Sequence, residues 1–165
     1  MTDEKRFELA KTIWQFGKDA EFDIGSDHFK EGVQGSCKGC SKNSYGLEGA
    51  VEAGLLTNEL LVSRGSELAE INPVDGESWS QIGRQQLKMK QLEAAAVSFE
   101  KALNGTTDKM EKALSNRKVE LADVLSQLGK SDEAKAKLED VDVDQLYGDF
   151  ETKYNDLIIE LDTDE

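Results

Sequence analysis

Residues 79–102 carry a spaced set of aromatic, aliphatic and small residues that is typical of two helices packed closely together. The set consists of Trp79, Ile82, Gly83, Ala95, Phe99 and Ala102. Gly83 and Ala95 are small enough to lie where the two helices cross, because larger side chains would push the backbones apart. Trp79, Ile82 and Phe99 can fill the groove between this pair and the next. The spacing therefore predicts a helical hairpin that packs against a neighbouring hairpin.

The rest of the chain also favours helices. Apolar residues recur at helical spacing, and no stretch alternates with a period of two for long enough to form a strand. Pro73 disfavours a helical conformation at Asn72, which predicts a helix end there, and Asp75–Glu77 offers the next helix start. We therefore expect an all-α fold with helices over residues 3–22, 45–71, 77–89, 92–103, 108–128, 131–138 and 144–161.

The pattern at 79–102 resembles the tetratricopeptide repeat, a helix–turn–helix unit of 34 residues. Residues 76–109 give the best match, and residues 110–142 give a second one in which Ala134 takes the place of Ala95. Those two alanines are 39 residues apart, which predicts an insertion that lengthens the helix beginning near Asp108. Lys118 stands where an aromatic residue is expected. Residues 42–75 form a degenerate unit, with Leu61 in the place of Ala95.

The resemblance implies an α-solenoid of about three antiparallel helical hairpins over residues 42–142. A helix over 1–24 precedes these repeats. Residues 25–46, rich in glycine and serine, are expected to form a flexible loop. An acidic helix and tail over 143–165 would close the array, since solenoids are usually capped.

Charge narrows the range of partners. The chain has 34 acidic and 20 basic residues, a formal net charge of −14, and residues 139–165 alone carry eleven acids and one base. Such a field repels phosphates and anionic lipids, so neither nucleic acid nor a membrane is an expected partner. The N-terminus lacks the basic and apolar regions of a secretory signal, and no apolar stretch approaches 20 residues. We expect a cytoplasmic protein.

The sequence offers little for catalysis. His28 is the only histidine, which excludes most catalytic triads and three-histidine metal sites. Cys37 and Cys40 form one CxxC motif, for which two ordinary thiols, a metal site completed by Asp27, His28 or another chain, and a redox pair are all open interpretations. We expect no enzyme activity and no cofactor.

The family resemblance implies a protein-binding adaptor or scaffold, in which the first helices of the repeats form a concave wall that holds a peptide or helix of another protein. That wall would carry Ser80, Arg84, Leu87, Lys88, Asn116, Val119, Asp123 and Gln127. Arg84 and Lys88 lie four residues apart and are expected to form a cationic spot. Two alternatives stay open. The protein could respond to metal or redox state through Cys37 and Cys40, or it could be a subunit of a larger assembly that docks through its acidic C-terminal helix.

Overall fold

The computed structural model describes residues 1–19 and 46–163, and within these ranges all regular structure is helical. The prediction of an all-α fold is confirmed for this part of the chain. The elements are α1 (Asp3–Asp19), α3 (Gly46–Glu52), α4 (Asn58–Ile71), α5 (Glu77–Lys88), α6 (Leu92–Asn104), the 3₁₀ turn η1 (Asp108–Ala113), α7 (Leu114–Gln127), α8 (Ser131–Glu139), the 3₁₀ turn η2 (Val143–Gln145) and α9 (Asp149–Thr163).

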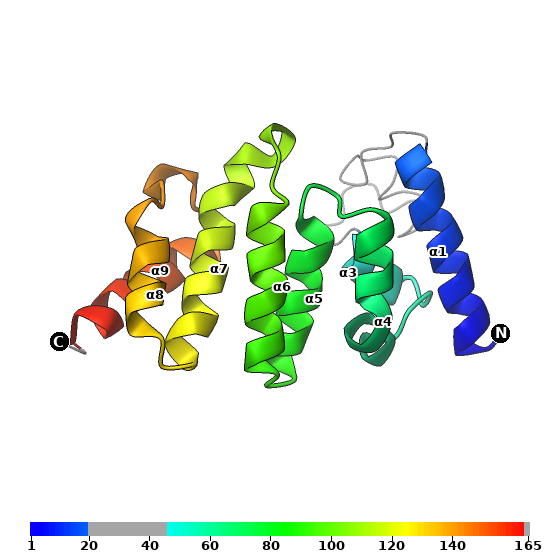
Figure 1. Ribbon diagram of the computed structural model, residues 1–165, viewed down its shortest axis with the longest axis horizontal. Helices are drawn as coiled ribbons and strands as arrows, with labels where there is room; N and C mark the ends of the chain where they lie inside the picture. Colours follow the sequence, from blue (N-terminus) through cyan, green and yellow to red (C-terminus); the bar gives the residue numbers. More distant parts are fainter. Residues whose placement is uncertain (20–45, 164–165) are drawn as a thin grey trace.

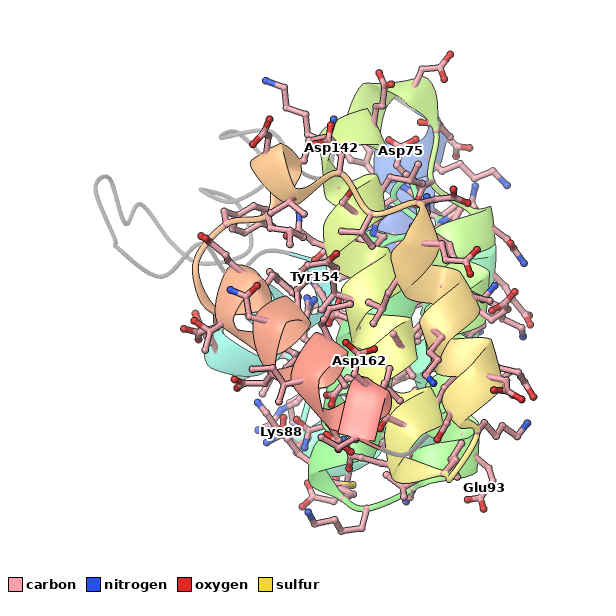
Figure 2. All side chains as sticks on the ribbon, turned by 90° about the vertical axis from the view of Figure 1, so that its left-hand side faces the viewer. Asp75, Lys88, Glu93, Asp142, Tyr154 and Asp162 are labelled. Atoms are coloured by element: carbon pink, nitrogen blue, oxygen red, sulfur yellow. The ribbon has the colours of Figure 1, made fainter. Side chains whose placement is uncertain are left out.

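The helices lie side by side along the long axis of the molecule (Figure 1). α1 packs on α4, α4 on α5, α5 on α6, α6 on α7, and α7 on α8. α3 also contacts α5, and α9 folds back onto α7 and α8 (Figure 2). α5 therefore contacts α3 on one side and α6 on the other, and α6 in turn packs against α7.

The interior consists of two apolar clusters. The first joins α1 to α3 and α4, with Phe7, Trp14, Leu47 and Leu68 fully buried. The second cluster joins α6, α7, α8 and α9, and it contains Phe99, Leu121, Ala134 and Leu161 among its buried residues. Burial of α1 against α4 explains the apolar spacing of the N-terminal helix, and Leu157 and Leu161 explain why α9 stays attached to the end of the array.

Gly83 lies at a close approach between α5 and α6. A Cβ atom at this position would stand 2.8 Å from Cδ1 and Cε1 of the Phe99 ring, which is closer than van der Waals contact allows. Ala95 is fully buried, and Trp79 packs against the first apolar cluster instead of pointing into solvent. The sequence prediction for this hairpin therefore agrees with the positions of its small and large residues.

Several helix boundaries differ from the predictions. The expected helix over 45–71 is two helices, because α3 ends at Glu52 and Thr57 begins α4 by accepting a hydrogen bond from the Leu60 amide. The expected long helix from Asp108 begins instead with the turn η1, and α7 starts only at Leu114. The last helix starts at Asp149 and not at 144.

The delay of α9 has a visible local reason. Residues 143–145 form the separate turn η2, in which the Asp142 side chain accepts a hydrogen bond from the Asp144 amide. Leu146 then adopts an extended conformation, and Gly148 has a φ of +55°. Leu146 and Tyr147, which fall within the predicted helix over 144–161, therefore belong to the connection before α9.

Candidate functional site

A groove of about 440 Å³ opens between α5, α7 and α9, with Phe99 of α6 at its base. Its apolar lining comes from Leu87, Phe99, Tyr147 and Phe150. The Tyr147 and Phe150 rings meet edge to face, with centroids 5.5 Å apart. Tyr147 remains 64% exposed, so this groove offers an aromatic side chain to solvent at its edge.

One wall of the groove contains an ion-pair cluster centred on Arg84. Its Nε donates to Glu48 Oε1 of α3 at 3.0 Å, and its Nη2 donates to Glu77 Oε1 of α5 at 2.9 Å. The third partner is Glu120 of α7, whose Oε2 lies 3.3 Å from Nη1. A single guanidinium thus contacts carboxylates from three helices, α3, α5 and α7.

Arg117 extends this cluster into the interior. Its Nη2 donates to Glu77 Oε2 at 3.0 Å, and its Nη1 donates to Thr106 Oγ1 at 2.6 Å and to the Asp75 carbonyl oxygen. The Arg117 side chain is only 3% exposed. These contacts tie α7 to the segment that precedes α5 and to the end of α6.

The cluster holds three carboxylates and two guanidinium groups, so one negative charge is in excess when every group is ionised. The Glu120 side chain is 7% exposed. Burial raises the pKa of Glu120 to about 7; the charge of Arg84 opposes this rise and the charge of Glu77 adds to it. Burial also lowers the pKa of Arg84, but the three carboxylates raise it by more, so Arg84 stays cationic.

Three of the predicted partner-binding residues are buried. Ser80 and Val119 are fully enclosed, and Asn116 is 2% exposed. Asn116 Nδ2 donates to the Gln145 carbonyl oxygen at 3.2 Å, and its Oδ1 accepts from the Tyr147 amide at 3.4 Å. The prediction that these three side chains face a partner is therefore wrong for this structure: the connection before α9 covers Asn116, Val119 packs inside the second apolar cluster, and Ser80 is enclosed on α5.

The other predicted site residues are at or near the surface. Leu87, Lys88 and Asp123 line the groove together with Arg84, whereas Gln127 is exposed outside it. The prediction that Arg84 and Lys88 form a cationic spot is wrong for Arg84, because three carboxylates already neutralise the charge of Arg84. Lys88 is exposed and forms no ion pair with any residue that the structure describes.

Sequence reasoning missed the side of the groove that α9 and its connection supply. Tyr147, Phe150 and Lys153 all line the groove, and Lys153 Nζ lies 3.1 Å from Asp123 Oδ2. The aromatic residues Tyr147 and Phe150 were a visible signal, but the sequence analysis assigned this segment only the role of capping the array.

Neither a metal site nor a membrane-spanning helix is found in the part of the chain that the structure describes. Within 1–19 and 46–163, no group of three or more histidine, cysteine, aspartate or glutamate side chains has the arrangement of a metal site. The candidates Cys37, Cys40 and His28 lie outside the described residues. No helix in the described part of the chain combines the length and apolar character needed to cross a bilayer. Comparison of the chain with protein-family models, with curated proteins and with solved structures finds no match.

Proposed function

We propose that this protein is a tetratricopeptide-repeat-like α-solenoid that acts as a protein-binding adaptor, and that it holds a peptide or helix of its partner in the groove between α5, α7 and α9. Arg84 and the other members of its cluster have a structural task in this proposal: they fix α3, α5 and α7 relative to one another. The binding surface is the apolar lining beside that cluster.

The helical pairs support the repeat part of the proposal. The short turn at Met89–Gln91 joins α5 to α6, and Leu128–Lys130 joins α7 to α8, so each pair runs antiparallel. Glu48 and Glu120 stand 36 residues before and after Arg84, which fits equivalent first helices spaced at about one repeat.

The single observation that carries the adaptor function is the apolar lining of the groove. Leu87, Phe99, Tyr147 and Phe150 come from four different segments yet line one open groove. Aromatic residues that remain partly exposed in a concave site are typical of surfaces that bind other molecules.

Site-specific photocrosslinking tests the groove directly. A photoreactive phenylalanine analogue placed at Leu87 is expected to form a covalent adduct with the partner in a lysate of the source cells. The matched control is the same analogue at Val97, which is 57% exposed on α6 and does not line the groove. Adducts that are identical from both positions, or that form only at Val97, would show that the groove is not the binding surface.

A further inference from the structure

A second depression continues the groove along α9. It has a volume of about 340 Å³ and shares Asp123, Asp149 and Lys153 with the first groove. Asp156 and Glu160 line only this second part. Asp149, Lys153, Asp156 and Glu160 are four, three and four residues apart, so they form one face of α9 that looks into the continuous groove.

The charges on this face are mostly uncompensated. Lys153 pairs with Asp123 across the groove, which removes the only base on that face of α9. Among the described residues, Asp149, Asp156 and Glu160 form no ion pair, and the contact of Glu160 is with the neutral Ser126 hydroxyl at 3.0 Å. The α9 side of the groove therefore carries three free negative charges.

The opposite side does not balance them. Arg84 is neutralised by its own carboxylates, so Lys88 is the one unpaired base that the described part of α5 contributes to the groove. The Arg84 cluster adds no net positive charge to the groove, because its carboxylates at least balance its two guanidinium groups. The groove thus combines an apolar floor near Leu87, Phe99 and Phe150 with an acidic wall along α9.

We propose that the partner segment bound in this groove is basic and amphipathic: one or two of its apolar side chains lie against Leu87, Phe99 and Phe150, and its lysine or arginine residues face the acidic wall of α9. This inference rests on the proposed function of the groove and adds the chemical class of the partner. Complementary charge selects such a segment because like charges placed together across an interface are repelled.

Other occupants fit the charges less well. An acidic segment would place its carboxylates beside Asp149, Asp156 and Glu160. A second copy of this chain, with its net charge of −14, would also bring like charge to the groove. An uncharged apolar peptide would fill the floor but leave the α9 wall without partners.

The test begins with a random 12-residue peptide library displayed on phage and selected on the full-length protein. Selected peptides are expected to combine apolar residues with lysine or arginine, and to crosslink to the photoreactive residue at position 87 but not to the one at 97. Fluorescence anisotropy then measures the affinity of one selected peptide for two charge-matched variants.

The groove variant is Asp156→Asn/Glu160→Gln, and the control is Glu151→Gln/Asp162→Asn. The control residues are exposed on the same helix, and neither lines the groove. Each variant removes two negative charges, so long-range attraction changes equally. We expect the groove variant to bind about tenfold more weakly, since two ion pairs are lost, and the control to change less than twofold.

The outcomes separate the two proposals. Selected peptides that crosslink at position 87 but are neutral or acidic, or equal losses of affinity in both variants, would overturn the basic partner while leaving the groove as a binding surface. Failure of every selected peptide to crosslink at position 87 would overturn both. Circular dichroism of the two variants checks that both keep the helical content of the wild type.

Discussion

Replacing Glu120 by glutamine is expected to change how the stability of the protein depends on pH. Folded Glu120 keeps its proton up to about pH 7, whereas the ordinary pKa of 4.5 applies to the unfolded chain. Between these two values the folded state binds more protons than the unfolded state, so the free energy of unfolding falls as the pH rises. The contribution of Glu120 is fully present below pH 4.5 and is lost as the pH passes through about 7.

The magnitude follows from the two pKa values. Their difference corresponds to about 3 kcal/mol, most of which falls between pH 5 and pH 8.5. Glutamine keeps an oxygen that can accept from Arg84 but carries no titrating charge. Relative to Glu120→Gln, the wild type should therefore lose about 3 kcal/mol of stability across this pH range.

Urea denaturation followed by circular dichroism at pH 5, 6, 7 and 8.5 measures this difference. Subtracting the free energy of unfolding of the variant from that of the wild type cancels the contributions of the other titrating groups, because both proteins share them. Glu133→Gln, which removes an exposed carboxylate from α8, serves as the control and should track the wild type. A wild-type-minus-variant difference that stays constant from pH 5 to pH 8.5 would refute the view that Glu120 is buried with insufficient positive charge around it.

Three further substitutions, with Arg64→Met as a control for one of them, test a close helix contact, a buried ion pair and a helix cap. Gly83→Ala should lower the stability by about 1 kcal/mol, because strain against Phe99 of about 2 kcal/mol exceeds the gain of about 1 kcal/mol in helix propensity; an unchanged or higher melting temperature would contradict the close approach. Arg117→Met should destabilise by about 3 kcal/mol in urea denaturation, whereas Arg64→Met, which breaks more exposed ion pairs, should lower the stability much less. Thr57→Ala should remove about 1 kcal/mol through loss of the helix cap, and equal thermal unfolding of variant and wild type would count against that bond.

Local patterns predicted most of the fold. The apolar spacing of 79–102 identified α5 and α6, and the small size of Gly83 and Ala95 identified where they approach each other. Asn72 and Pro73 marked the end of α4 because the restriction before proline acts within two residues. Features determined by neighbouring residues in the chain were therefore accessible from the sequence.

The groove depended on contacts between distant residues and was predicted only in part. Arg84 looked like a free cation because its partners Glu48 and Glu120 are 36 residues away in each direction. Asn116 looked accessible because the sequence does not state that residues 145–147 will fold over it. The position of α9 decides both the burial of Asn116 and the shape of the groove, and that position follows from packing in three dimensions.

The reach of the Arg84 side chain has a consequence for how the protein unfolds. In arrays whose hairpins touch only their neighbours, unfolding can start at one end and stop part way. Here, detachment of α3 or of α7 would remove a counter-ion from the central helix, leaving Arg84 with fewer carboxylates. Loss of α3 or of α7 therefore weakens α5 in the middle of the molecule, so partially unfolded species that lack only one of these helices should be sparsely populated.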